Sequence, residues 1–84
     1  MIDEFYAKGS YLYGDVNYNG KIDIDDATLI QKASIDLVEL TDTQKAIADV
    51  NADGRISILD VTCVQKHIAE YTSGTGKTGD AYPA

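Results

Sequence analysis

The segment Asp15–Asp26, DVNYNGKIDIDD, decides the organisation of the chain, because oxygen-bearing side chains recur along it at fixed places. Counted from Asp15, they fall at the first, third, fifth, ninth and twelfth positions, and Gly20 takes the sixth. A calcium ion needs about six to eight oxygen ligands, and a twelve-residue loop with a glycine at its turn supplies them locally. We interpret the segment as a calcium-binding loop. Its candidate ligands are Asp15, Asn17, Asn19, the Lys21 carbonyl, Asp23 and Asp26.

The same pattern returns 34 residues later in Asp49–Asp60, DVNADGRISILD, with Gly54 at the sixth place. T-x-x-Q-K follows within both repeats, so the match extends beyond the loops. The spacing is that of EF-hand loops, except that aspartate replaces glutamate at the twelfth position. Two loops in register predict two calcium ions, since an acidic surface turn does not require twelve ordered positions. The second set of candidate ligands is Asp49, Asn51, Asp53, the Arg55 carbonyl, Ser57 and Asp60.

The length of 84 residues allows one small domain, whose core alone is marginal because it buries only about 60% of the unfolded surface. Cys63 is the only cysteine, so no disulfide within the chain can stabilise the fold. Bound ions can, because their ligands converge only in the folded state. The net charge is −7, and two calcium ions would bring it to about −3 (−7 + 4). This acidic balance disfavours nucleic acid as a partner.

The sequence predicts no membrane span, because it contains no run of about eighteen apolar residues. Its first residues also lack the basic-then-apolar pattern of a signal peptide. Loops of this modest charge suit surroundings rich in calcium, since extracellular modules bind the ion at roughly 0.1 to 1 mM. We therefore expect an extracellular location.

Apolar spacing predicts a small all-α domain. A first helix is expected from Ile24 to about Ser34, and a capping box at Thr41 predicts a short helix over Asp42–Ala48. A last helix is expected from Ile58 to about Tyr71. The residues expected on the buried helix faces are Ala27, Ile30 and Ala33 in the first helix, and Val61, Val64, Ile68 and Tyr71 in the last.

The remaining segments carry weaker patterns. Ile22 and Ile56 occupy the eighth place of their loops, where extended backbone is expected to pair and couple the two ion sites. Residues 1–10 show no periodicity and are interpreted as a leader. Residues 72–84 begin with a stretch rich in glycine and threonine, typical of a flexible tether.

With both loops and their flanks in view, the chain resembles the dockerins, the cohesin-binding modules of cellulosomes. The resemblance rests on YGDVN at Tyr13–Asn17, ADVNADG at Ala48–Gly54, aspartate as twelfth ligand and the 34-residue offset. Tyr18 and Asn19 depart from the family, which often has glycine and aspartate there. The resemblance implies a dockerin domain at 11–71. It would contain loop-plus-helix repeats, or half EF-hands, at 13–35 and 49–71 and an intervening helix at 41–48.

The function implied is non-catalytic. Such a module is a monomer when free and binds a cohesin of a scaffoldin in a calcium-dependent way, which anchors its parent enzyme or scaffold subunit for plant polysaccharide degradation. The resemblance places the partner contacts at the tenth and eleventh loop positions and along the helix that follows. These residues are Ile24, Asp25, Thr28, Gln31, Lys32, Ile58, Leu59, Thr62, Gln65 and Lys66.

Two further features follow from the resemblance. Many dockerins present either helix to one cohesin. Here Asp25 in the first repeat corresponds to Leu59 in the second, and this asymmetry favours an orientation in which the second helix is at the centre of the interface. In dockerins an aromatic residue before the first loop often packs on the C-terminus, so Tyr13 is expected to contact Tyr82 or Pro83 and clasp the ends together.

Other functions fit the residues less well. Asp23 and Asp26 would be the acid and base of a glycosidase, but they face an ion, and a chain this small offers little room for a cleft. A calcium sensor that binds helical targets is the alternative function, although such sensors use a methionine-rich groove and Met1 is the only methionine. Cys63 and His67 are too few to hold a soft metal, so we expect Cys63 in the core or partner face and His67 at the surface or at the boundary of the core.

Overall fold

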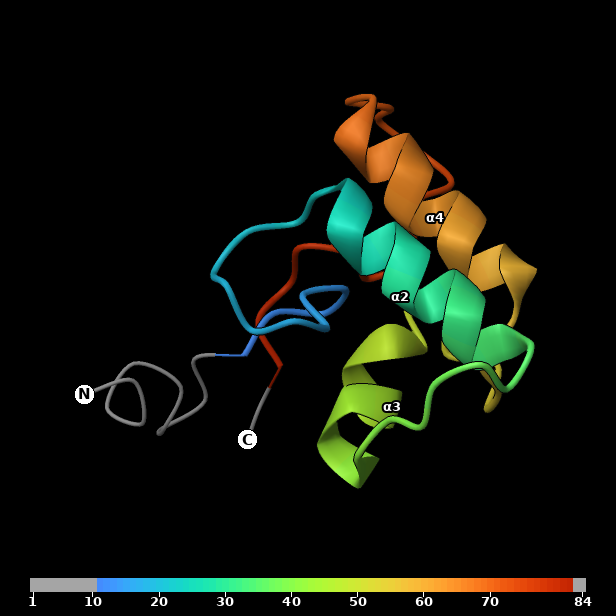
Figure 1. The fold of residues 1–84 in the computed structure, drawn as a ribbon. Helices are drawn as coiled ribbons and strands as arrows, with labels where there is room; N and C mark the ends of the chain where they lie inside the picture. The colour runs from blue at the N-terminus through green and yellow to red at the C-terminus, as the bar shows by residue number, and fades with distance from the viewer. Residues whose placement is uncertain (1–10, 83–84) are drawn as a thin grey trace.

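Three α-helices form the framework of the domain in the computed structural model, which describes residues 11–82. They are α2 (Ile24–Ser34), α3 (Asp42–Ala48) and α4 (Ile58–Ile68). Helices α2 and α4 lie side by side, and α3 lies below α2 in the view of Figure 1. Over this described range there is no β-strand, and one isolated bridge joins Leu12 to Ala81. The predicted all-α fold is confirmed. None of these helices is long and apolar enough to cross a membrane.

Each helix begins at a capping box, in which two side chains satisfy backbone N–H groups that the first turn leaves unpaired. Thr41 and Gln44 cap α3 as predicted. The N-caps of α2 and α4 are Asp23 and Ser57, the ninth residues of the two loops. The end of each loop and the start of the next helix are therefore one hydrogen-bonded unit.

The C-terminus of α4 differs from the prediction. Glu70 adopts a left-handed conformation (φ 65°), and the Tyr71 N–H donates to the Lys66 carbonyl at 2.9 Å. This cap ends the helix at Ile68, and Ile68 and Tyr71 are 38% and 59% exposed. The prediction of a helix and buried stripe reaching Tyr71 is therefore wrong. The same cap closes the first repeat 34 residues earlier, at Lys32, Asp36 and Leu37.

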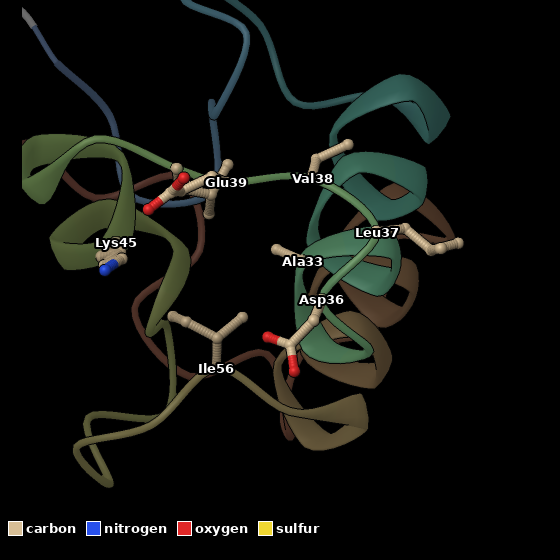
Figure 2. A pocket seen from close by; sticks show the side chains of 8 residues that line it. Ala33, Asp36, Leu37, Val38, Glu39, Lys45 and Ile56 are labelled. Atoms are coloured by element: carbon tan, nitrogen blue, oxygen red, sulfur yellow. The ribbon is translucent and has the colours of Figure 1, made fainter.

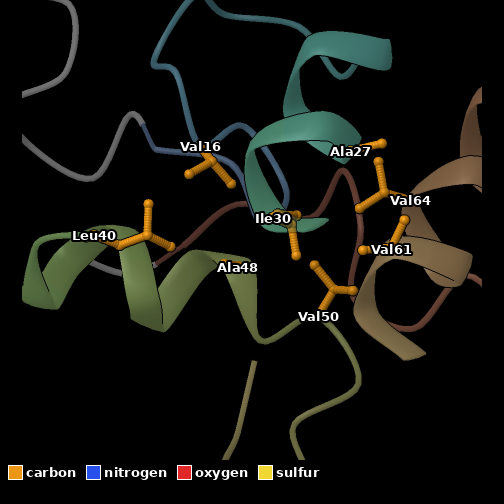
Figure 3. Close-up of a cluster of buried hydrophobic side chains, with 8 residues drawn as sticks. All are labelled: Val16, Ala27, Ile30, Leu40, Ala48, Val50, Val61 and Val64. Atoms are coloured by element: carbon orange, nitrogen blue, oxygen red, sulfur yellow. The ribbon is translucent and has the colours of Figure 1, made fainter. Parts of the chain in front are cut away.

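The core lies where the helices meet the beginnings of the two loops (Figure 3). Val16 and Val50, the second residues of the loops, are fully buried in it. Helix packing and loop geometry are consequently coupled, because neither valine can move without opening a void. The buried cluster consists of Val16, Ala27, Ile30, Leu40, Ala48, Val50, Val61 and Val64.

The expected pairing of Ile22 with Ile56 is not present: neither residue takes part in a bridge within residues 11–82. Both side chains are half-buried and pack against the core instead. The expectation of a ladder between the loops was wrong because these positions serve the packing of the helices.

The segment interpreted as a tether also differs from the expectation. Residues 75–82 fold back onto the start of the described chain through backbone hydrogen bonds, where the red and blue segments meet in Figure 1. Thr78 in its middle is only 5% exposed. A segment with a buried side chain and backbone hydrogen bonds to the domain is part of the fold. Residues 1–10, Pro83 and Ala84 lie outside the described residues.

Candidate calcium loops and partner face

The first aspartate of each loop organises the turn around its own carboxylate. Asp15 accepts the N–H groups of Gly20 at 2.9 Å and Asn19 at 3.1 Å. In the second loop Asp49 accepts the N–H groups of Gly54 at 2.9 Å and Asp53 at 3.2 Å. Gly20 and Gly54 have φ values of 88° and 89°, which only glycine adopts readily. The two loops thus share one backbone geometry.

The twelfth residue joins the loop to its helix. The buried Asp26 accepts the N–H of Asn17 at 3.2 Å through one oxygen and that of Asp23 at 3.0 Å through the other. Its counterpart Asp60 is equally buried. The equivalent bonds of Asp60, from Asn51 and Ser57, measure 3.3 Å and 2.9 Å. Both oxygens of each carboxylate therefore point into the loop.

Carboxylates converge most clearly in the second loop. Asp49, Asp53 and Asp60 each offer one oxygen, and these three oxygens lie within 4.8 Å of one another. The equivalent residues of the first loop include the amide of Asn19, whose Nδ2 donates to Asp23 at 3.2 Å. Each loop still has three carboxylates at ligand positions. Such a set of oxygen donors fits a hard cation such as calcium.

Burial disfavours the charged form of these carboxylates when no cation is bound. It raises the pKa of Asp26 to about 6, with smaller contributions from the negative charges of Asp15 and Asp23. Burial also raises the pKa of Asp15 and Asp60. The pKa of exposed Asp53 is lowered, mainly by the hydrogen bond from the Arg55 N–H. A divalent ion bound among the buried groups would offset their repulsion and desolvation.

The seventh residues, Lys21 and Arg55, have exposed side chains, in keeping with a position that contributes only a carbonyl. Asn17 and Asn51 turn their Oδ1 atoms back into the loops, where these accept the N–H groups of Asn19 and Asp53 at 3.3 Å. The assignment of individual ligands stays a prediction.

The predicted partner residues on α2 and α4 are exposed, with one exception. Ile24, Ile58 and Leu59 are large apolar side chains that are 59%, 56% and 57% exposed. Among the other predicted contacts only Lys66 is half-buried, with its aliphatic stem against Gly74. This face, which we call the partner face, combines exposed apolar groups with polar neighbours, as expected of a docking surface. Which of its residues make contact stays a prediction.

Residues considered for other chemistry have structural roles. Asp23 and Asp26, the pair considered for glycosidase chemistry, form the capping box of α2. Cys63 packs against the core, and burial raises the pKa of its thiol. The His67 ring covers Gly79, where an added Cβ would lie 2.7 Å from its Cε1 atom.

A depression that the sequence did not predict lies between the connector after α2, helix α3 and the second loop (Figure 2). It has a volume of about 480 Å³ and carries the side chains of Asp36, Glu39 and Lys45 near its rim. No short motif marks it, because its lining comes from segments that are far apart in the sequence. Its lining consists of Ala33, Asp36, Leu37, Val38, Glu39, Leu40, Lys45 and Ile56.

Paired loop–helix repeats of this geometry define an all-α domain built from two half EF-hands. A family model described as the dockerin type I domain matches residues 13–69. The chain therefore belongs to the dockerin type I family, whose members are non-catalytic modules that bind calcium.

A solved structure supports the same assignment. The chain is similar to one described as the ScaB dockerin from Acetivibrio cellulolyticus, with a mutation in its C-terminal helix, in complex with the third cohesin of ScaC and displaying a type I interaction. The two chains are 25% identical with a TM-score of 0.69, and the match covers 81% of this chain and 99% of the other. No curated protein gives a significant match.

Proposed function

We propose that this domain is a calcium-dependent interaction module that binds a cohesin and thereby anchors its parent protein in an extracellular cellulosome. The observation that carries the proposal is the position of Ile24, Ile58 and Leu59, which are exposed at the tenth and eleventh places of loops built to hold calcium. Membership of the dockerin family and similarity to a dockerin in a cohesin complex support it.

Two calcium ions are proposed, one in each loop. When bound, an ion supplies positive charge that holds the converging oxygens together. The side-chain ligands in the first loop are Asp15, Asn17, Asn19, Asp23 and Asp26, with the Lys21 carbonyl. Those in the second loop are Asp49, Asn51, Asp53, Ser57 and Asp60, with the Arg55 carbonyl.

Calcium dependence follows from how closely the ligands and the partner face are joined. Ile24 and Asp25 lie between two proposed ligands, Asp23 and Asp26, which also form the capping box of α2. Ser57 and Asp60 flank the equivalent pair at the start of α4. An ion that fixes these ligands fixes the first turn of each helix. The partner face thus acquires its shape as the loops fill.

The two repeats differ at one central position of the partner face. Asp25 in the first repeat corresponds to Leu59 in the second. A pocket that fits Leu59 would have to desolvate the Asp25 carboxylate in a rotated complex, at a cost on the order of a few kcal/mol. About 1.4 kcal/mol already changes a population tenfold. We therefore expect one dominant orientation, with Ile58 and Leu59 at the centre of the interface.

The function is tested by a pull-down against a panel of cohesins, with and without a calcium chelator. Binding to a cohesin that is lost with chelator supports the proposal. Leu37→Asp is a matched control, because Leu37 is 67% exposed but lies outside the partner face, and it should bind like the parent chain. Binding to amphipathic helical peptides and to none of the cohesins would instead favour a calcium sensor.

The orientation is tested separately by Ile58→Asp combined with Leu59→Asp, compared with Ile24→Asp alone. The double variant should lose most of its affinity, whereas Ile24→Asp should retain it. Two interchangeable orientations would be indicated if both variants bound as tightly as the parent chain and only their combination failed.

A further inference from the structure

Residues 75–82, which we call the C-terminal strap, contact the second calcium loop through the backbone of its second residue. The Lys77 N–H donates to the Val50 carbonyl at 2.7 Å. Gly76 approaches the same carbonyl so closely that a Cβ at this position would overlap the oxygen, and its φ of 59° is left-handed. Val50 follows the first ligand Asp49 directly and is fully buried. The strap therefore holds the start of this loop by backbone contact.

The same strap is fastened to the start of the first loop. The Gly79 N–H donates to the Tyr13 carbonyl at 2.9 Å, and the Tyr13 N–H donates to the Asp80 carbonyl at 2.8 Å. The methyl group of Thr78 covers Gly14, where an added Cβ would lie 3.0 Å away. Gly14 immediately precedes Asp15, the first ligand of that loop. One short segment thus touches the chain beside the first ligand of both loops.

Aromatic rings extend the contact into the first loop itself. The Tyr82 ring lies 5.4 Å from that of Tyr13 and 6.3 Å from that of Tyr11, measured between centroids. Tyr11 in turn lies 5.2 Å from Tyr18, the fourth residue of the loop. Lys77 places its ammonium 5.3 Å from the Tyr13 ring. Tilted and edge-on aromatic pairs at these distances attract one another, so the rings link loop one to the strap.

Helix α3 provides a second connection between the loops, but it is not equivalent. The Gly14 N–H donates to the Ile47 carbonyl at 2.7 Å, and Gln44 donates through Nε2 to the Val16 carbonyl at 2.9 Å. Val16 is the counterpart of Val50, so the same carbonyl is held by α3 in loop one and by the strap in loop two. The strap therefore supplies to the Val50 carbonyl the hydrogen bond that α3 supplies to the Val16 carbonyl.

We propose that the C-terminal strap couples the two calcium sites, so that an ion in one loop raises the affinity of the other. The strap can dock fully only when the backbone at Tyr13–Gly14 and at Val50 is in place together. Each ion orders one of these positions and so makes strap docking easier for the other site. Coupling of this kind is reciprocal. The proposal rests on the proposed calcium function of the loops.

The test compares two glycine variants in the full chain. Gly76→Ala should prevent the approach to Val50. Gly74→Ala is the matched control, because Gly74 is also left-handed (φ 75°) but the atoms nearest to an added Cβ belong to the flexible Lys66 side chain. Calcium titrations followed by NMR resolve the sites, since the amides of Gly20 and Gly54 bond to Asp15 and Asp49 separately. The affinity of site one is measured with site two intact and with site two disabled by Asp49→Ala.

Disabling site two should weaken site one by about 5-fold or more in the parent chain and in Gly74→Ala, within the usual range of coupling between sites. In Gly76→Ala the same change should fall below about 2-fold. An equal factor in all three backgrounds would overturn the proposal. Absence of calcium binding at either site would overturn the proposed calcium function as well, so the two failures are distinguishable.

A second measurement uses the unmodified chain and does not depend on a variant folding. The Lys77 amide should become protected from hydrogen exchange only as both the Gly20 and Gly54 signals saturate with calcium, although its acceptor Val50 lies in loop two. Protection that follows the Gly54 signal alone, while Gly20 is still shifting, would contradict coupling through the strap.

Discussion

Replacing Thr78 with valine should stabilise the domain. Thr78 is 5% exposed, and its hydroxyl oxygen has no hydrogen-bond partner among residues 11–82. Burying a hydroxyl without a partner costs about 1 to 3 kcal/mol in protein variants. Valine keeps the branched shape, leaves the bond from the Thr78 N–H to the Thr75 carbonyl intact, and adds about 0.8 kcal/mol for a further buried carbon.

The expected gain is therefore about 1 to 3 kcal/mol in the free energy of unfolding. For a domain of this size, each kcal/mol raises the thermal midpoint by about 4 to 8 °C. The assay is thermal unfolding followed by circular dichroism at saturating calcium. Thr72→Val is the control, because Thr72 is exposed and should change the midpoint little.

A midpoint for Thr78→Val that is no higher than that of Thr72→Val would refute this reasoning. It would mean that the buried hydroxyl is already satisfied. The reasoning would also fail if Thr78→Ser, which keeps the hydroxyl and removes the methyl group against Gly14, were as stable as the parent chain.

Three further predictions concern the loops and the ends of the chain. Burial raises the pKa of Asp26 from 3.8 to about 6, so the ionised carboxylate opposes folding when calcium is absent. Helical ellipticity in chelator should therefore increase as the pH falls from 7 to 5. Greater ellipticity at pH 7 than at pH 5 would contradict this. Asn19→Asp adds a fourth carboxylate to loop one and should tighten that site in a calcium titration, with an unchanged or weaker affinity as the opposing result. Deleting residues 81–84 removes the Tyr82 ring from Tyr13 and should lower the thermal midpoint by a few degrees at fixed calcium, whereas no shift would assign these residues to a linker.

The starts of the helices could be predicted from the sequence because caps are local. Thr41 and Gln44 are three residues apart, and the box they form depends on nothing distant. The boxes of α2 and α4 use aspartate at the third helical position, so the usual glutamine or glutamate signal was absent although Asp23 and Ser57 are good N-caps. The ligand spacing of the loops was predictable for the same reason, since it lies within twelve residues.

Most features that depend on distant contacts could not be predicted. The exception is the contact of Tyr13 with Tyr82, which the family resemblance implied and which is confirmed by the 5.4 Å between the ring centroids. Apolar spacing continues to Tyr71, and glutamate is a good helix former. No local sequence signal therefore predicted the left-handed Glu70 that ends α4. Glycine and threonine in residues 72–80 are equally compatible with a linker and with a tight turn. Contacts such as the approach of Gly76 to Val50 distinguish the two, and these contacts require the folded core.

The connection between the two loops also differs from the predicted one. The sequence suggested a direct ladder through Ile22 and Ile56, but these side chains are used by the core. The connection runs instead through α3 and through the strap, both of which meet the chain beside the first ligands. A sequence pattern could identify the two loops but not the element that joins them.

The central claim, that two calcium ions fold this domain, is tested most directly by counting ions and following the fold in one sample. Native mass spectrometry should show two calcium ions per chain, reduced to one by Asp15→Ala or by Asp49→Ala. Excess chelator should abolish much of the helical circular dichroism of the parent chain. Helical ellipticity that is unchanged in chelator while the protein stays monomeric, or fewer than two ions at saturating calcium, would contradict the account.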